Sequence, residues 1–456
     1  MNIKIIPKKL NGTLRCIDSK SHAHRLIIAS AMADTLPFGK VNNANFDDNA
    51  LDDKNTSHQM PCKNQIIKTT TACERNQNSC HVNINDTSQD IEVTKRGISA
   101  ILNGEKDIYC GESGSTLRFL LPMVAVVSSN LGNKTEITFW GKGRLPERPL
   151  HPLDEEMIKH RCKIYKSTDS SEEICTISGD ISSGEYILPG DVSSQYITGL
   201  LMSLPLLEGD SNIKLTSPME SKGYVDLTLK VLEDFGIEIN IKGDDFFIPG
   251  GQKYSAPSSE IYPESDWSQG AFWLVAKALG SDINLTGLND NSVQGDRAIK
   301  KIIEEFESVK NSIELCETEK PFEYPQAITI DARNIPDLIP VVSVLAALSP
   351  CKTVITNAER LRIKESDRIT STCNMIKSLG GNVIEEENGM TIIGEKSLTG
   401  GTVDGARDHR IVMAGTIASS ACENPVTILG AEAVSKSYPK FFEDYEHLGG
   451  IITEIS

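Results

Sequence analysis

A short apolar segment rich in small residues recurs six times along the chain, and each copy is long enough for three to four helical turns. Most copies are apolar on nearly all sides, which is typical of a buried helix. The six segments are residues 21–33, 114–127, 193–204, 266–279, 335–348 and 408–421. The recurrence predicts a repeated unit with a helix in its interior.

Each buried segment is followed by β-branched, strand-like sequence and then by an amphipathic helix pattern. Several of these patterns stop at a glycine, such as Gly236, Gly380 or Gly449, the residue expected just after a helix end. The amphipathic patterns cover residues 91–102, 149–160, 224–235, 296–306, 367–379 and 439–448. Helices and strands thus alternate at intervals of roughly 70 residues, which predicts α/β layers.

A polar tract, residues 49–89, interrupts the first repeat and has neither a helical nor a strand period. We interpret it as an inserted surface loop. Its cysteines and histidines are Cys62, Cys73, Cys80, His58 and His81. Their spacings match no common zinc finger or ribbon, so a metal site is the less favoured interpretation.

Length and charge exclude several classes of protein. With 456 residues the chain is long enough for two to four domains. Its net charge of −17 argues against a protein whose main task is to bind nucleic acid. No apolar run approaches the roughly 18 residues of a membrane span, and the first residues lack an apolar signal core. The 11 cysteines include no CxxC pair. We therefore expect a cytoplasmic protein with reduced thiols, which is a monomer and has no nucleic-acid or membrane partners.

Polar and charged residues stand at the start of every buried segment. Serine and aspartate are good N-caps, so ordinary capped helices are one interpretation. However, the helix dipole disfavours cations at a helix start, and Lys20, Arg25 and Arg410 lie in or beside first turns. Free N–H groups, hydroxyls and cations together form a cradle for anions. Several such helix starts around one crevice would bind a substrate with several phosphates or carboxylates.

Nine short motifs follow one another in order: 19–21 (SKS) with Arg25, 112–118 (ESGSTLR), 144–149 (RLPERP), 192–195 (VSSQ), 221–226 (SKGYVD), 335–337 (IPD), 362–368 (RIKESDR), 408–410 (DHR) and 435–439 (SKSYP). In this order, and over nearly the whole chain outside the insert, they resemble the 3-phosphoshikimate 1-carboxyvinyltransferase (EPSP synthase) family of enolpyruvyl transferases. One such string would be a weak signal, whereas the ordered set is specific.

The resemblance implies an α/β fold of two similar domains, each of three βαβαββ units with buried helices, arranged as an inside-out α/β barrel. The active site would lie in the cleft between the domains. We expect a discontinuous first domain, residues 1–18 plus 262–456, and a second domain, residues 19–261, that carries the insert 49–89. The hinges would lie near residues 18–20 and 258–263.

The family transfers the enolpyruvyl group of phosphoenolpyruvate to the 5-hydroxyl of shikimate 3-phosphate and releases phosphate, a step of chorismate and aromatic amino acid biosynthesis. The resemblance implies no metal or redox cofactor. It implies that Asp337 is the base near the hydroxyl and that Glu365 and Lys20 are candidates for proton delivery. Simple helix capping is the alternative role for Asp337.

The resemblance also assigns ligands for both anionic substrates. Shikimate 3-phosphate would contact Lys20, Ser21, Arg25, Ser193, Ser194, Ser221, Tyr224, Asp337 and Lys364. Phosphoenolpyruvate would contact Lys20, Gly114, Arg144, Gln195, Arg368, Arg410 and Lys436. Two further cations, Arg118 and Arg148, either bind a substrate directly or hold the ligands in position. Lys364 and Arg368 would share a face of any helix through both, and two cations on one face favour an anion between them.

Three positions depart from the pattern. Glu112 and Arg360 stand where much of the family has asparagine, and Ser115 stands where much of it has threonine. An acid beside a phosphoenolpyruvate site would repel the ligand unless a cation such as Arg118 or Arg144 pairs with it. We therefore do not count Glu112 among the expected ligands.

Three other interpretations stay open at this point. The sister enzyme that acts on UDP-N-acetylglucosamine shares the fold, but it has a cysteine where this chain has Gly143. RNA 3′-phosphate cyclase has a related fold, which the acidic composition opposes. A non-enzymatic repeat scaffold would not need charged residues at six helix starts.

Overall fold

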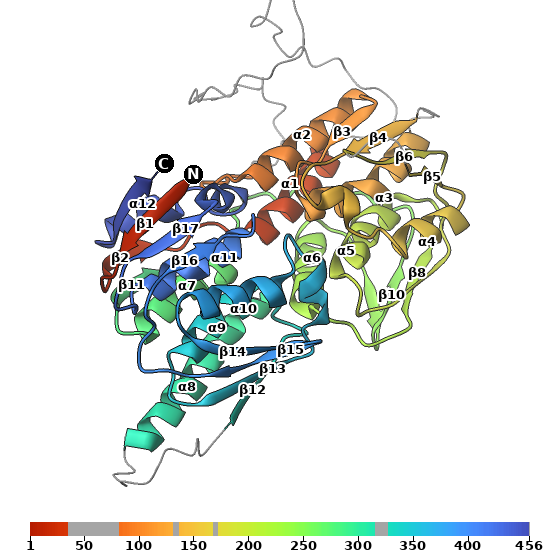
Figure 1. Ribbon diagram of the computed structural model, residues 1–456. Coiled ribbons are helices and arrows are strands. Elements are labelled where there is room, and N and C mark those ends of the chain that lie inside the picture. Colours follow the sequence, from red (N-terminus) through yellow and green to blue (C-terminus); the bar gives the residue numbers. More distant parts are fainter. Residues whose placement is uncertain (35–81, 131–135, 167–171, 315–326, 456) are drawn as a thin grey trace, which may run out of the picture.

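The computed structural model describes residues 1–34, 82–130, 136–166, 172–314 and 327–455, which form two lobes side by side (Figure 1). One lobe contains both ends of the chain, and the other contains a second hydrophobic cluster, whose residues lie between Leu26 and Tyr254. The five zinc-site candidates of the insert lie outside the described residues.

The six buried helices are present as predicted. They are α1 (Lys20–Asp34), α3 (Gly114–Asn130), α5 (Ser194–Ser203), α7 (Trp267–Ala278), α9 (Ile339–Ala347) and α11 (His409–Ser419). Every residue of α9 and of α11 is buried. Such helices have no polar face for solvent, so they must lie inside a lobe.

The amphipathic helices cover the outside of the same units. They are α2 (Gln89–Asn103), α4 (Leu153–Lys159), α6 (Lys222–Asp234), α8 (Ile299–Glu314), α10 (Arg368–Ser378) and α12 (Phe441–His447). Gly236, Gly380 and Gly449 all have positive φ, as expected of glycines just beyond a helix end. Helix α4 begins later than predicted because Pro149 and Pro152 precede it, and proline favours the first position of a helix over its interior.

Three four-stranded sheets share one strand order. They are β3 (Asp107–Tyr109), β4 (Ile137–Trp140), β6 (Glu173–Ser178) and β5 (Lys163–Tyr165); β7 (Glu185–Leu188), β8 (Ser211–Leu215), β10 (Asp245–Ile248) and β9 (Asn240–Lys242); and β12 (Ala327–Asp331), β13 (Lys352–Thr356), β15 (Gly389–Ile393) and β14 (Asn382–Glu386). In each sheet the first pair is parallel and the other pairs are antiparallel. A buried helix links the parallel strands and an amphipathic helix leads to the antiparallel ones, which is the βαβαββ unit.

The N-terminal strand completes the last unit. Strand β1 (Asn2–Ile6) pairs with β17 (Val426–Leu429) and β18 (Ile451–Ile455), and β16 (Thr402–Asp404) is parallel to β17. Strand β2 (Asn11–Arg15) runs parallel to β11 (Asp282–Thr286). The two ends of the chain therefore belong to one lobe.

The remaining elements are the 3-10 helices η1 (Leu145–Glu147), η2 (Leu204–Leu206), η3 (Gly295–Ala298), η4 (Glu359–Ile363) and η5 (Ala431–Lys436).

Two separate hydrophobic clusters correspond to the lobes. One draws on residues 3–17 and 267–448 and the other on residues 26–254. On this basis we propose residues 1–18 with 262–456 as the first domain and residues 19–261 as the second; they are called the first and second lobe below. Where the chain crosses between them, Asp18 pairs with Ser265 and Val82 pairs with Ile261 as isolated bridges.

The described end of the insert, residues 82–88, lies at this crossing. The backbone N–H of Asn85 donates to the Asp18 carboxylate at 2.7 Å, and Ser88 caps helix α2. No helix in the described residues is long and apolar enough to cross a membrane.

Candidate active site

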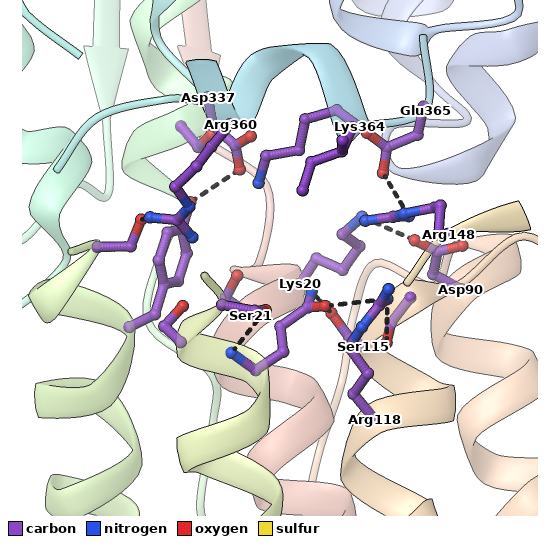
Figure 2. Close-up of a pocket in the computed structure, with 18 of the residues that line it drawn as sticks. Lys20, Ser21, Asp90, Ser115, Arg118, Arg148, Asp337, Arg360, Lys364 and Glu365 are labelled. Atoms are coloured by element: carbon purple, nitrogen blue, oxygen red, sulfur yellow. Dashed lines mark hydrogen bonds and ion pairs between the residues drawn. The ribbon is translucent and has the colours of Figure 1, made fainter. Parts of the chain in front are cut away.

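A polar pocket lies between the lobes, and most of the residues predicted to bind or transform substrate line it. From the second lobe come Lys20, Ser21, Arg25, Gly114, Ser193, Ser194, Gln195, Ser221 and Tyr224, and from the first lobe come Asp337, Lys364, Glu365, Arg368 and Arg410. Figure 2 shows Arg360, Lys364 and Glu365 on one side of the gap and Ser21, Ser115 and Arg118 on the other. Arg118 and Arg148 line the pocket as well.

Several of the polar residues at the helix starts act as caps, and the cations lie among them. Ser193 caps α5 and Asp408 caps α11 through backbone N–H groups. Asp266 caps its own helix α7 at Gln269, and its second oxygen accepts from the N–H of Lys20 at 3.1 Å. One carboxylate therefore joins the starts of α7 and α1, which belong to different lobes.

Asp337 lies at the centre of the cations and does not cap a helix. Helix α9 begins at Ile339, later than predicted, and no side chain caps it. The Asp337 carboxylate instead pairs with Arg368 at 2.7 Å and with Arg410 at 3.1 Å. Burial by itself would raise the pKa of Asp337, but Arg410, Arg368 and Lys364 together hold it well below its usual range. Asp337 is therefore ionised in the free site.

Tyr224 lies between Asp337 and a second acid. Its hydroxyl donates to Asp337 Oδ2 at 2.8 Å and is 3.3 Å from Asp296 Oδ2. Burial, together with the charge of Asp337, raises the pKa of Asp296 to about 7. The other oxygen of Asp296 has no partner among the described residues. The two acids differ because the arginines pair directly only with Asp337, so a proton bound by this pair of acids resides on Asp296 and not on Asp337.

Glu365 is tied to the same arginine from the other side. It pairs with Arg368 at 2.7 Å and with Arg148 of the second lobe at 3.7 Å (Figure 2). Burial would raise the pKa of Glu365, but Arg368 and Arg148 hold it well below its usual range. Arg368 is only 1% exposed and also pairs with Asp408 at 2.7 Å, so three carboxylates surround one guanidinium.

Lys364 lines the pocket, but it does not lie on a helix as considered from the sequence. Residues 364–367 are not helical, since η4 ends at Ile363 and α10 begins at Arg368. The shared helix face of Lys364 and Arg368 is therefore wrong, although both residues line the pocket. Burial lowers the pKa of Lys364 to about 8, against the opposing effect of Asp337. The ammonium can thus lose its charge within the physiological range.

Hydroxyls gather at one end of the pocket, around the starts of α5 and α6. Ser193, Ser194 and Ser221 line this end. The φ of Ser221 is 56°, a left-handed conformation that a serine adopts only when its surroundings hold it there. Arg25 bridges the two helices, with Nε on Thr228 and Nη2 on Thr198 and on the carbonyl of Tyr224.

Two guanidiniums meet over a glycine at the opposite end. Arg118 donates to Gln195 Oε1 at 3.3 Å, and the amide of Gln195 donates to Ser115 at 3.1 Å. A Cβ at Gly114 would lie 2.6 Å from Arg118 Nη1 and 2.9 Å from Arg148 Nη1. Only glycine therefore lets both guanidiniums approach the start of α3 this closely.

Two predicted phosphoenolpyruvate ligands do not line the pocket. Arg144 is exposed, and Lys436 is bound by Glu112 across the lobes at 2.5 Å and by the carbonyl of Arg407 at 2.7 Å. The cation that compensates Glu112 is thus Lys436, and neither Arg118 nor Arg144, the partners considered from the sequence, fills that role.

Several pocket residues were not predicted from the sequence. Asp90 pairs with Lys20 at 2.8 Å, Asp266 caps α7 as described above, and His409 lines the pocket. Asp408 is not among the lining residues, but it pairs with Arg368, which lines the pocket. Burial lowers the pKa of His409 to about 3, so this imidazole is neutral. The capping motif at Asp408 was the available signal for that residue, whereas Asp90 follows a polar tract and carries no local signal.

Comparisons with known proteins give one consistent family. The profile described as EPSP synthase (3-phosphoshikimate 1-carboxyvinyltransferase) matches residues 5–445. The 3-phosphoshikimate 1-carboxyvinyltransferase of Clostridium novyi is 40% identical over 468 residues, which cover 100% of this chain and 99% of that protein. The protein of the same name from Clostridium kluyveri is 39% identical over 459 residues, with 100% and 99% covered.

A solved structure has the same fold. The EPSP synthase of Acinetobacter baumannii superimposes with a TM-score of 0.70 at 21% identity, over 99% of this chain and 100% of that one.

Proposed function

Because the chain belongs to the EPSP synthase family, we propose that its inter-lobe pocket transfers the enolpyruvyl group of phosphoenolpyruvate to the 5-hydroxyl of shikimate 3-phosphate. The products are 5-enolpyruvylshikimate 3-phosphate and phosphate. The observation that carries the proposal is the ionised Asp337, held beside Arg368, Arg410 and Tyr224 in a pocket rich in cations.

The charges of the pocket suit two anionic substrates. Phosphoenolpyruvate and shikimate 3-phosphate each carry a phosphate and a carboxylate, and desolvated cations offset such charges more strongly than water does. The serines and Arg25 at the starts of α5 and α6 support binding of shikimate 3-phosphate there. Arg368, Arg410 and Gln195 support binding of phosphoenolpyruvate, with Lys20 between the two substrates.

Asp337 is the candidate base for the attacking hydroxyl. In the free site its pKa is held low by two arginines, which limits its basicity. An anionic substrate on Arg368 and Arg410 would share their charge and raise the pKa of Asp337 towards its ordinary value. Substrate binding thus prepares the base, and the hydroxyl proton passes to Asp337 as the new C–O bond forms.

Glu365 is the candidate acid for the methylene carbon, with Lys20 as the alternative donor. Glu365 shares Arg368 with Asp337, so the same substrate anion would raise its pKa and let it hold a proton. Protonation of the methylene carbon makes the adjacent carbon electrophilic, and the hydroxyl adds to it to give a tetrahedral ketal phosphate. Loss of a proton from the new methyl group then expels phosphate and restores the enol double bond.

The test is release of phosphate from phosphoenolpyruvate by the purified protein. Release that requires shikimate 3-phosphate supports the proposal. Release that requires UDP-N-acetylglucosamine instead would assign the sister reaction, and no release with either acceptor would refute both. We also propose that the chain works in the cytoplasm as a monomer. The reaction described above involves proton transfers, an addition and an elimination without net oxidation or reduction, and the pocket's own cations offset the substrate charges, so we propose no metal or redox cofactor.

A further inference from the structure

A row of three oxygen atoms connects the candidate base to a second acid. The Tyr224 hydroxyl is 2.8 Å from Asp337 Oδ2 and 3.3 Å from Asp296 Oδ2. Each contact needs a hydrogen atom between its two oxygens, and a tyrosine hydroxyl carries only one. If both acids were ionised, one contact would hold two oxygens together without a hydrogen. One of the two acids must therefore supply the second hydrogen.

Asp296 is the acid whose surroundings favour the proton. Asp337 pairs with Arg368 at 2.7 Å and with Arg410 at 3.1 Å, whereas no cation in the described part of the chain pairs with Asp296. Asp296 is only 3% exposed. Burying an ionised carboxylate without a paired cation is costly, and a proton removes that cost. The hydrogen bonds thus run from Asp296 to Tyr224 and from Tyr224 to Asp337.

The charges on the neighbouring elements agree with this direction. The groups that face Asp296 are Tyr224 of α6, Asp266 at the start of α7, Asp337 ahead of α9, and Arg410 of α11. Burial and the two other carboxylates raise the pKa of Asp296 to about 7, against the opposing effect of Arg410. That arginine is already engaged by Asp337.

The cations next to Asp296 in the sequence do not neutralise it. Arg297 donates to the backbone carbonyl of Asp290, and Lys300 of α8 pairs with the Asp290 carboxylate at 2.8 Å. Both of these side chains are exposed. A proton, and not a cation, therefore compensates Asp296.

We propose that Asp296 is a positioning residue of the reaction, which stays protonated, donates to Tyr224 and thereby commits the tyrosine hydrogen to the Asp337 carboxylate. The proposal rests on the proposed function, in which Asp337 is the base. Asp296 is not one of the described residues that line the pocket, so it acts through Tyr224 and not on the substrates. Loss of its proton would free the tyrosine hydrogen for either acid and add a negative charge beside a site for anions. The ionised form should therefore be the inactive one.

The activity test measures kcat/KM for shikimate 3-phosphate against pH, since this ratio reports the titrating groups of the free protein. Asp296→Asn keeps a donor for Tyr224 that cannot ionise, whereas Asp296→Leu has a similar size without a donor. At about pH 6, Asp296→Asn should stay within about threefold of the wild type and Asp296→Leu should lose roughly 10- to 100-fold. Above about pH 7 the wild type should decline relative to Asp296→Asn, by up to about tenfold per pH unit. Lys364 titrates in both proteins, so the ratio between them isolates Asp296.

A double-mutant cycle tests whether Asp296 acts through the tyrosine. Tyr224→Phe removes the link, so adding Asp296→Leu to it should cost less than about threefold more. Asp290→Asn is the matched control, because it removes the charge of an exposed acid from the same lobe. This control should keep the wild-type pH profile.

Infrared difference spectroscopy between about pH 6 and about pH 9 tests the protonation without turnover. The wild type should have a C=O stretch of a neutral carboxyl group that disappears as the pH rises through about 7 and shifts in deuterated water. Asp296→Asn should lack this band. A merely structural role for Asp296 would not produce the band.

The proposal is overturned if the wild type and Asp296→Asn have the same infrared bands, if the ratio of their kcat/KM values is constant over this pH range, or if Asp296→Leu costs as much in Tyr224→Phe as in the wild type. The infrared spectra and the Asp296→Asn profile decide the proposal even if Asp296→Leu does not fold. A wild type that releases no phosphate with shikimate 3-phosphate would instead refute the proposed function, and the infrared bands would still show where the proton lies.

Discussion

Replacing Glu112 with glutamine should make phosphoenolpyruvate bind more tightly. Glu112 Oε2 lies 2.5 Å from Lys436 Nζ, a predicted ligand of this substrate. The two side chains belong to different lobes and are 25% and 10% exposed. In the free protein the Glu112 carboxylate is therefore paired with the Lys436 ammonium, which the substrate would need as a ligand.

The magnitude follows from the charges. Two anions on one ammonium lie about 4–5 Å apart and repel each other by about 3–4 kcal/mol at an effective dielectric constant of about 20. Since a quarter of the Glu112 side chain is exposed, screening by water reduces this to roughly 1–2 kcal/mol. Glutamine keeps the shape and removes the charge, so the KM for phosphoenolpyruvate should fall about 5- to 30-fold.

The assay is steady-state phosphate release with shikimate 3-phosphate saturating and phosphoenolpyruvate varied. Glu92→Gln provides the matched control, because it removes one negative charge from the same lobe at a half-exposed side chain that pairs with Lys95. That variant should keep the wild-type KM. An unchanged or increased KM in Glu112→Gln would refute the reasoning, because it would show that Glu112 does not compete with the substrate.

Three further results are expected. Asp337→Asn should lower kcat by roughly 10²- to 10⁴-fold while binding of shikimate 3-phosphate changes far less, since it removes the base; a kcat near that of the wild type would contradict this role. Burial sets the pKa of Lys364 at about 8 in the free protein, so affinity for shikimate 3-phosphate should fall as pH rises above 8, by up to about tenfold per pH unit. Calorimetry across pH checks this, and Lys364→Arg should abolish the decline because arginine stays charged. The pKa of Asp296 is raised to about 7, so the folded state binds its proton more tightly than the unfolded state, and its contribution to stability is lost as pH rises towards 7. Asp296→Asn should therefore raise Tm by roughly 2–5 °C at pH 8 and have little effect near pH 4, and equal effects at both pH values in thermal unfolding would contradict the assignment.

The repeated architecture could be predicted because its signals are local. All twelve predicted helices are present, and the glycines at positions 236, 380 and 449 mark helix ends by their positive φ. Apolar periodicity and helix caps involve residues within one or two turns of one another, so they can be recognised in the sequence alone. The largest late starts occur at prolines: α4 starts at Leu153 and α9 starts at Ile339, each later than its pattern suggested. Helix α8 differs as well, because it starts at Ile299 and ends at Glu314, beyond the predicted residue 306.

The candidate site was predicted as a set of residues, because ordered motifs name side chains without giving their partners. Lys20, Asp337 and Glu365 were named from motifs, and the structure places all three in one pocket. The pairing of Glu112 with Lys436 could not be predicted from the sequence, since 324 residues separate the two. The position of Asp337 ahead of α9, and its contact with Tyr224, also depend on how the lobes meet.

The order of residues thus decides where helices and strands form, how they repeat and which chemical groups the chain has at its disposal. The tertiary structure decides which cation neutralises which carboxylate, and therefore which acid is charged. The physical reason is that a pKa depends on burial and on distances of a few ångströms between lobes. Asp296 and Asp337 illustrate this, because the same side chain is driven to opposite pKa shifts by its neighbours.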